Sequence, residues 1–579
     1  MKTFYELKKF YAFSFLLNCS KKLRFSFVFI PFLFLFFFLV SPSYQVKLNY
    51  YNTSFWDLSS VNSPTNFSLG TWRVIDTNVE IAEVNYTSEI YGNTKVIING
   101  YITRPIQEGT YPAILLMHGS YGTANSMLPF AIELAKRGYV ALSISGPGQG
   151  KSTGPPESNE NRLNLSISPY FSYYYRLTYS ALRGVSLLFE LPFVNKSAIA
   201  VCGASQGGLE SIWVAALDKR IRTSVPVVAG GNFSYLISTG SLAIGHIPKN
   251  ENASSQRALK LAEFFDPIAY AKEIRIPILF LVGTSDEFFP FFSFNETYSS
   301  VSSIKSIDML PNVGHFEVQS AWIYSALIWF DYWLKGEGHL PSVNISYYKI
   351  EGDKIEINAT GKNVDSVIVN YRYDMPWDRW KTKNLEAKGN SFSGYIEKPI
   401  FGSLYFYVGG IVNGEQVVSS EVRSVGSTIL DSFVFMLFIF SFMASLFLIV
   451  ISLGLDWFVS LQRGLILFFF WLSYFLPIII VSKTIPITIW TFFRTYELHI
   501  PQFVTFLFVL SFFVLLFFSS TSDLNLILSL LITSIFSLTF YLTVSSLLGE
   551  YVEIIPSSAM IFQLLCLIVV LLETKLRKD

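Results

Sequence analysis

Cysteine and charged residues are both scarce in this chain. Of its 579 residues, three are cysteines and 15% are charged, whereas 51% are hydrophobic. Only Cys202 lies between residues 44 and 427, so that part forms no internal disulfide and must rely on a hydrophobic core. The net charge of +1 gives no basic footprint for nucleic acid. The sequence contains no metal-ligand cluster or dinucleotide fingerprint, so we expect no cofactor.

Long apolar runs at both ends of the chain account for the hydrophobic excess. Lysines and an arginine precede an uncharged run over residues 25–40, which is either a signal peptide cut near Ser43 or an uncleaved anchor. After residue 427, five runs approach the ~20 residues that cross a bilayer. They cover residues 429–451, 465–481, 503–519, 524–548 and 558–572. We therefore predict a basic N-terminal segment (1–43) and a membrane domain of five helices (428–579).

Charge and sequons predict where the part between these ends is located. The basic ends belong in the cytoplasm by the positive-inside rule, which places residues 44–427 outside it. Ten asparagines of that part begin glycosylation sequons: Asn52, Asn66, Asn85, Asn164, Asn195, Asn232, Asn252, Asn295, Asn344 and Asn358. Apart from Asp431 near the start of the first run, the five runs carry no Asp, Glu, Lys, Arg or His, which favours an anchor or a binding site for a membrane-protein partner over a transporter. We expect a glycosylated, multi-pass protein of the cell membrane.

The most informative motif is VCGASQGGL at residues 201–209. An apolar, strand-like run ends in a Gly-Ala-Ser-Gln-Gly turn, and a helical pattern follows. Such a sharp turn needs small flanking residues, and it projects the serine hydroxyl above the sheet. Ser205 is therefore the candidate nucleophile, provided that its partners are also present.

A base and an acid follow in the order that this kind of turn requires. In a fold with such a turn, the serine, the aspartate and the histidine follow one another in this order along the chain, each after a buried strand. Of the five histidines, only His315 follows a strand pattern at that place in the order, and Asp286 ends the strand-like run before it. Glu287 and Asp308 compete as the acid. Glu287 comes one residue late and Asp308 lies inside a strand pattern, so we favour Asp286.

The segment YPAILLMHGSYG supplies the remaining part of such a site. Gly119 and Ser120 follow the first buried strand, where these folds contribute one backbone N–H to an oxyanion hole. The second N–H comes from the residue after the nucleophile, Gln206. His118 precedes the oxyanion glycine, so we interpret it as a residue that orients the loop.

At these residues the chain resembles the α/β-hydrolase superfamily. Within it, the resemblance is to the acetyl xylan esterase and dienelactone hydrolase-like branch, which borders the prolyl oligopeptidase (S9) catalytic domain. Residues 75–337 carry it, chiefly GYITRPIQEGTYPAILLMHG, GASQGGLESIWVAALDKRI and FFDPIAYAKEIRIPILFLVGTSDEFFP. The resemblance implies Ser205 as nucleophile, His315 as general base and then acid, and Asp286 as the group that orients the imidazole. Ser145 departs from it, because the superfamily often has Asp there.

The order of strand and helix patterns predicts the architecture. Strands alternate with helices over residues 44–340, which indicates a doubly wound, mostly parallel sheet outside the cytoplasm. Insertions at 148–170 and 234–265 are the predicted cap. After Pro341, short alternating strands predict a β-sandwich spacer over 341–427. Its Tyr373, Trp377 and Trp380 form either a ligand-binding face or, as we favour, core and inter-domain packing.

Together these features predict a membrane-anchored serine hydrolase that cleaves carboxylic esters. We favour small ester substrates over peptides, because prolyl oligopeptidases usually carry a propeller before the hydrolase domain and too few residues precede the sheet here. A peptidase without a propeller is one alternative. A catalytically silent surface binding protein is another, and labelling with a fluorophosphonate discriminates between an activated serine and a silent fold.

Overall fold

The computed structural model describes residues 51–425, apart from residues 92, 240, 245–246, 248–254, 318, 374–378, 390 and 399–402, and three short strands beyond them. These strands, β20 (Ile479–Val481), β21 (Ile485–Ile487) and β22 (Ile554–Pro556), pair in one small sheet. The prediction of a helix over 465–481 is wrong at its end, since a run of β-branched residues forms β20 there. The remaining predicted membrane runs and the N-terminal segment lie outside the described residues. Among the described residues, no helix is long and apolar enough to span a bilayer.

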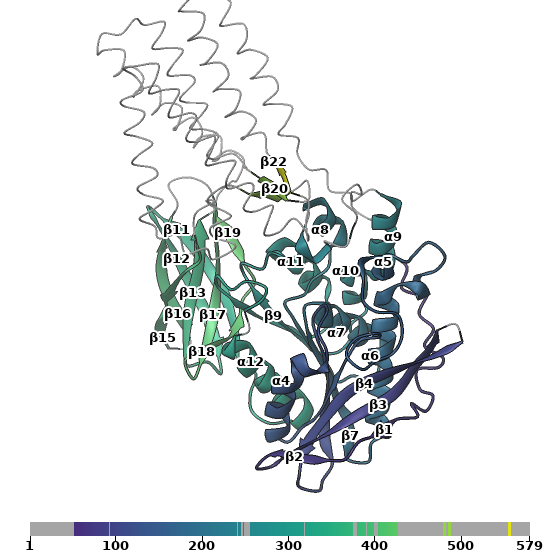
Figure 1. Cartoon of the computed structure of the whole chain (residues 1–579). Helices are drawn as coiled ribbons and strands as arrows, with labels where there is room; N and C mark the ends of the chain where they lie inside the picture. The colour runs from purple at the N-terminus through teal and green to yellow at the C-terminus, as the bar shows by residue number, and fades with distance from the viewer. Residues whose placement is uncertain are drawn as a thin grey trace, which may run out of the picture. The chain divides into compact units, whose positions relative to one another are not determined.

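Ten strands form one mixed sheet (Figure 1), in the order β1-β3-β4-β6-β5-β7-β8-β9-β10, with β2 paired to β3. Strands β5 to β10 pair in parallel with one another, whereas β4 pairs antiparallel with β3 on one side and with β6 on the other. The bounds are β1 Ser68–Leu69, β2 Arg73–Asp76, β3 Val79–Tyr91, β4 Thr94–Pro105, β5 Tyr111–Met117, β6 Val140–Ile144, β7 Val194–Ala204, β8 Thr223–Val227, β9 Ile278–Gly283 and β10 Lys305–Leu310.

Helices cover both faces of this sheet, as the alternation of side chains along β5 requires. Ile114 and Leu116 pack into the core beneath α4 (Ala124–Lys136) and α12 (Ser320–Phe330). Leu115 and its neighbours two residues away face the opposite core, which is closed by α6 (Tyr173–Glu190) and α7 (Gln206–Leu217). Helices thus alternate with strands along the chain, as the sequence pattern predicts. The predicted α/β architecture is thus confirmed, and we call residues 68–335 the α/β domain.

Both predicted insertions contain helices. Residues 148–170 include α5 (Asn159–Arg162) and the start of η1 (Pro169–Phe171). In the second insertion, the chain forms α8 (Phe233–Thr239), η2 (Leu242–Ile244) and α9 (Gln256–Phe265). The remaining elements of the α/β domain are α10 (Pro267–Ala271), α11 (Phe291–Ser300) and the π-helical turn η3 (Asp331–Lys335).

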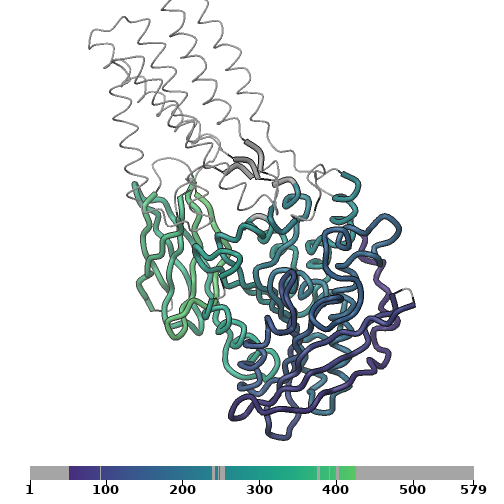
Figure 2. Tube along the Cα trace, viewed as in Figure 1, coloured from purple at the N-terminus to yellow at the C-terminus, as the bar shows by residue number. Residues whose placement is uncertain are grey.

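The chain then enters an all-β part, which we call the β-domain (residues 342–425; Figure 2). One sheet has the order β11-β12-β16-β15, and the other has the order β14-β13-β17-β18 with β19 paired to β17. The strands are β11 Ser342–Glu351, β12 Lys354–Lys362, β13 Ser366–Tyr373, β14 Lys381–Asn384, β15 Glu386–Lys388, β16 Ser391–Glu397, β17 Leu404–Val412, β18 Glu415–Ser419 and β19 Arg423–Val425. One apolar core includes side chains from both sheets. The all-β prediction for this part of the chain is confirmed.

Candidate active site

Ser205 lies at the turn between β7 and α7. Its φ of 57° and ψ of −115° are angles that an L-residue adopts only under strain. A Cβ on Gly203 would lie 2.4 Å from the carbonyl oxygen of Gly207, and one on Gly207 would lie 2.2 Å from that of Met117. The Ser205 N–H donates to the carbonyl oxygen of Val227 at 2.9 Å, which anchors the turn to β8. The turn therefore depends on glycine on both sides of the serine.

The structure brings His315 and Asp286 to Ser205, from the loops after β10 and β9. The Ser205 Oγ lies 2.8 Å from Nε2 of His315. Nδ1 of His315 lies 3.0 Å from each carboxylate oxygen of Asp286. Because an ionised carboxylate only accepts hydrogen bonds, we assign the ring proton to Nδ1, which leaves Nε2 to accept from the serine hydroxyl. This arrangement can take a proton from Ser205.

Neighbouring groups fix the orientation of this acid and base. Oδ1 of Asp286 accepts hydrogen bonds from the backbone N–H groups of Phe288, at 2.9 Å, and Phe289, at 2.8 Å. The ring of Phe288 stacks on the imidazole of His315, with centroids 4.2 Å apart and planes 17° apart. In the second insertion, Ser241 donates to the carbonyl oxygen of Phe288. The insertion therefore contacts the loop that carries the acid.

The two competing acids have other partners. Glu287 accepts a 3.4 Å hydrogen bond from the backbone N–H of His315 rather than from its ring, and burial raises the pKa of its carboxyl. Asp308 is fully buried in β10 and accepts hydrogen bonds from Ser325 Oγ at 2.8 Å and Gln416 Nε2 at 3.0 Å. Burial raises the pKa of Asp308 to about 7. Neither carboxylate bonds to the imidazole.

The turn after β5 approaches Ser205 through Gly119, on which a Cβ would lie 3.4 Å from the Cβ of the serine. The N–H of Tyr121 donates to the Glu157 carboxylate at 2.7 Å, and the N–H of Gly122 donates to the carbonyl oxygen of Gly119 at 3.0 Å. Among the described residues, the N–H of Ser120, which lies between Gly119 and Tyr121 in the chain, has no hydrogen-bond partner. The N–H of Gln206 begins α7, where a helix has no internal acceptor. Both groups are therefore available to a negatively charged oxygen.

His118 bonds within the loop rather than to the serine. Its Nε2 accepts from the backbone N–H of Gly146 at 3.1 Å, so Nδ1 carries the proton and donates to the carbonyl oxygen of Gly119 at 2.7 Å. Burial lowers the pKa of this imidazole, which favours the neutral form that can make both bonds. These two bonds connect the turn after β5 to Gly146, and the orienting role of His118 stays a prediction.

A buried ion pair that the sequence analysis did not identify supports the same turn. Arg162 and Glu157, both in the first insertion, are 6% and 8% exposed and bond to each other. Nη2 of Arg162 also donates to Ser120 Oγ at 3.1 Å and to Gln206 Oε1 at 3.2 Å, and Gln149 donates to Glu157. In the sequence, the available indication of this ion pair was that opposite charges occur within a polar insertion rich in Pro and Gly. The insertion thus contacts both Ser120 and Gln206.

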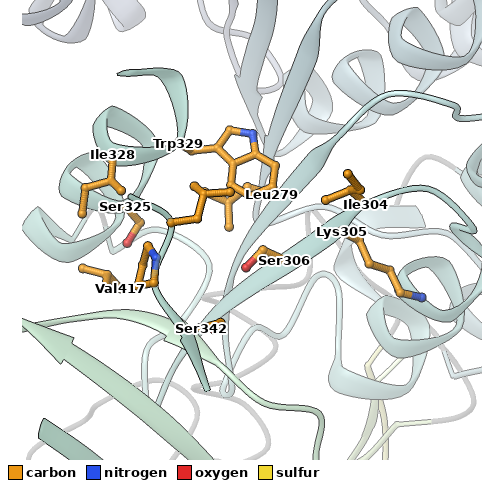
Figure 3. A pocket seen from close by; sticks show the side chains of 11 residues that line it. Leu279, Ile304, Lys305, Ser306, Ser325, Ile328, Trp329, Ser342 and Val417 are labelled. Atoms are coloured by element: carbon orange, nitrogen blue, oxygen red, sulfur yellow. The ribbon is translucent and has the colours of Figure 1, made fainter. Parts of the chain in front are cut away.

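A cavity of about 170 Å³ lies elsewhere, between the two domains (Figure 3). Leu279 and Ser306 line it from the sheet, Ser325 and Trp329 from α12, and Val417 from the β-domain. Ser205, His315 and Asp286 do not line it. The cavity is therefore separate from the candidate active site.

A parallel sheet with a serine at a strand-to-helix turn, followed by an acid and a histidine after later strands, defines an α/β hydrolase. Residues 49–330 match the family model described as acetyl xylan esterase (AXE1). The resemblance expected from the sequence is thereby confirmed over these residues.

Individual relatives have low sequence identity to this chain, and the curated relatives are longer than the segment that matches it. The acetyl esterase Axe7A of Xylanibacter ruminicola is 23% identical over 258 residues, which are 42% of this chain and 58% of that protein. The uncharacterized peptidase YuxL of Bacillus subtilis is 24% identical, over 40% of this chain and 35% of that protein. A solved acetyl xylan esterase from Paenibacillus sp. R4 is 21% identical, with 50% of this chain and 98% of that structure covered and a TM-score of 0.44. The chain thus spans at most about three fifths of the length of these two curated relatives.

Proposed function

We propose that this chain is a serine esterase of the acetyl xylan esterase type, with Ser205 as nucleophile, His315 as general base and Asp286 as the acid that orients it. The observation that carries the proposal is the unbroken chain of hydrogen bonds from Asp286 through His315 to the Ser205 hydroxyl, at 3.0 and 2.8 Å. The family match over residues 49–330 supports an ester as the substrate. The strained backbone at Ser205 supports its role as the reacting group.

The reaction proceeds in two acyl-transfer steps. Nε2 of His315 takes the hydroxyl proton while Ser205 Oγ forms a bond to the carbonyl carbon of the ester. The bond between that carbon and the alcohol oxygen then breaks, and the imidazolium returns its proton to the leaving alcohol. Water attacks the acyl-enzyme with His315 again as base, which releases the acid and restores the serine. In both steps the backbone N–H groups of Gln206 and Ser120 stabilise the negative oxygen.

The substrate class in this proposal is a short-chain acyl ester, with acetylated carbohydrate as the first candidate. The description of the matching family supports this choice. The rates of turnover of p-nitrophenyl acetate and of peptidyl p-nitroanilides separate the two activities. An esterase cleaves the ester faster, whereas a peptidase would use the same serine to attack the amide. Faster turnover of the amides would contradict the esterase assignment.

We also propose that the catalytic part lies outside the cytoplasm on a membrane anchor. The apolar runs at 25–40 and beyond residue 427 and the sequons between them support this location. Labelling intact and permeabilised cells with a membrane-impermeant fluorophosphonate tests it. Labelling that requires permeabilisation would contradict an external active site.

The decisive test of the chemistry is fluorophosphonate labelling of the detergent-solubilised full chain. We expect the wild-type protein to be labelled and the Ser205→Ala and His315→Ala variants to be unlabelled. Folded wild-type protein that is not labelled would contradict the proposal and favour a surface binding protein with a silent hydrolase fold.

A further inference from the structure

The turn between β10 and His315 is bonded to the loop that carries Asp286. Asn312 has a φ of 61°, a left-handed conformation that asparagine tolerates better than most residues. Its N–H donates to Thr284 Oγ1 at 2.7 Å, and the N–H of Ser285 donates to the carbonyl oxygen of Val313 at 2.9 Å. The segment before the histidine and the segment before the acid therefore form one bonded unit.

The side chain of Asn312 leaves this unit and bonds to the β-domain. Its Nδ2 donates to the carbonyl oxygen of Trp380 at 2.8 Å, and the N–H of Trp380 donates back to Oδ1 at 2.9 Å. The indole of Trp380 packs against Tyr407, with centroids 5.1 Å apart, and both side chains join the main core of the α/β domain. The amide of Asn312 is thus held by two bonds to a backbone segment that is itself fixed by packing.

The strand that leads to this turn is held from the same side. The Tyr407 hydroxyl and Gln416 Nε2 each donate to the carbonyl oxygen of Met309 at 2.8 Å. The N–H of Met309 donates to Ser419 Oγ at 3.0 Å, and Gln416 also donates to the buried Asp308. The β-domain therefore satisfies the backbone of β10 three residues before Asn312, and the two sets of contacts act on the same short segment.

We propose that the β-domain positions the catalytic histidine, and that Asn312 is the positioning residue through which it acts. The two-way bond between Asn312 and Trp380 holds the turn that places His315 Nε2 at 2.8 Å from Ser205 Oγ. A misplacement of about 1 Å between reacting groups can lower a rate on the order of a hundredfold. This inference rests on the proposed function, because its readout is the reactivity of Ser205.

Asn312→Gly in the full-length chain tests the inference, because glycine adopts the positive φ without strain and removes only the side chain. Asn413→Gly is a matched control. Asn413 also has a positive φ, of 51°, and its Nδ2 donates from the β-domain to the hydroxyl of Tyr324 on α12 at 2.6 Å. Each variant therefore loses side-chain bonding between the domains at a left-handed asparagine, but only Asn312 adjoins the histidine.

With p-nitrophenyl acetate, we expect Asn312→Gly to lower kcat about tenfold or more while KM stays within about twofold. Asn413→Gly should keep both kcat and KM within about twofold of wild type. Thermal unfolding of both variants shows how much of any change comes from stability.

Equal kcat values for Asn312→Gly and Asn413→Gly, in an active wild-type background, would overturn the positioning role alone. A wild-type chain that turns over no ester would instead contradict the proposed function. If Asn312→Gly does not fold, Asn312→Asp replaces it, since its carboxylate still accepts from Trp380 N–H but loses the donor to the Trp380 carbonyl. A kcat for that variant equal to wild type would overturn the inference.

Discussion

The guanidinium of Arg162 lies 3.1 Å from the hydroxyl of Ser120 and thereby connects the first insertion to the oxyanion turn. Its ion pair with Glu157 holds the same turn a second time, because Glu157 accepts the N–H of Tyr121. The peptide groups around Ser120 are therefore fixed by a charged pair that is almost completely buried.

We expect Arg162→Lys to lower kcat about ten- to a hundredfold on p-nitrophenyl acetate, because the lysine side chain is one bond shorter and its ammonium would not reach the position of Nη2, which bonds to Glu157, Ser120 and Gln206. Arg220→Lys is the matched control. Arg220 also forms a part-buried ion pair, with 2.6 Å between its Nη2 and Oδ2 of Asp218, but it does not bond to Ser120 or Gln206. Its kcat should stay within about threefold of wild type. Equal losses of kcat in the two variants would contradict a specific role for Arg162.

The choice between the two adjacent carboxylates can be tested directly. Asp286→Asn replaces the acceptor of the His315 Nδ1 proton by an amide and should lower kcat by on the order of 10³ to 10⁴. Glu287→Gln keeps an oxygen for the backbone N–H of His315 and should cost less than about tenfold. Steady-state kinetics at one pH on the alkaline side of the profile would separate them. A larger loss in Glu287→Gln would transfer the acid's role to Glu287.

The buried Asp308 predicts a pH dependence of stability. Burial raises the pKa of its carboxyl from 3.8 to about 7 in the folded protein, so between these values the native state holds a proton that the unfolded chain has released. The contribution of Asp308 to the free energy of unfolding therefore falls as the pH rises from about 4 to 7. In Asp308→Asn this contribution is absent. The melting temperature of wild type, measured relative to this variant, should decrease from pH 5 to pH 8, and a constant difference would contradict the prediction.

Two sequons in the β-domain are expected to differ in glycan occupancy. Asn344 on β11 is exposed, whereas the side-chain nitrogen of Asn358 on β12, to which a glycan would bond, is buried. In a host that glycosylates exported protein, we expect Asn344→Gln to remove one glycan and Asn358→Gln to remove none. Intact-protein mass spectrometry measures both. A mass loss in Asn358→Gln would show that the nitrogen is accessible when the glycan is attached.

Local patterns were sufficient to predict that Ser205, Asp286 and His315 lie within hydrogen-bond distance of one another in turn, from the acid to the imidazole to the hydroxyl. Ser205, Asp286 and His315 each follow a buried strand, and the parallel sheet brings the carboxyl ends of those strands together whatever their distance along the chain. The predicted roles of Gly119, Ser120 and Gln206 depend on the same rule and stay predictions, supported by where their backbone lies.

Residues that act across the fold left no such pattern. Arg162 bonds to side chains 42 and 44 residues away, and neither spacing nor periodicity distinguishes it from a solvated charge in a loop. Asn312 and Trp380 belong to different domains, so their pairing depends on how the domains pack, which no local sequence signal specifies. The preference for packing over ligand binding agrees with the position of Trp380, whereas Trp377 lies outside the described residues.

The hydrogen bonds that the β-domain makes to Met309 also bear on solubility. In the α/β sheet β10 pairs with β9 on one side only, and the outer N–H and carbonyl of Met309 are satisfied by Ser419, Tyr407 and Gln416 instead of another strand. An open sheet edge is a template for pairing with a second chain. A fragment that ends before Ser342 would therefore expose β10 as an open edge for association with a second chain. The smallest fragment of this hydrolase that we expect to stay soluble includes the β-domain.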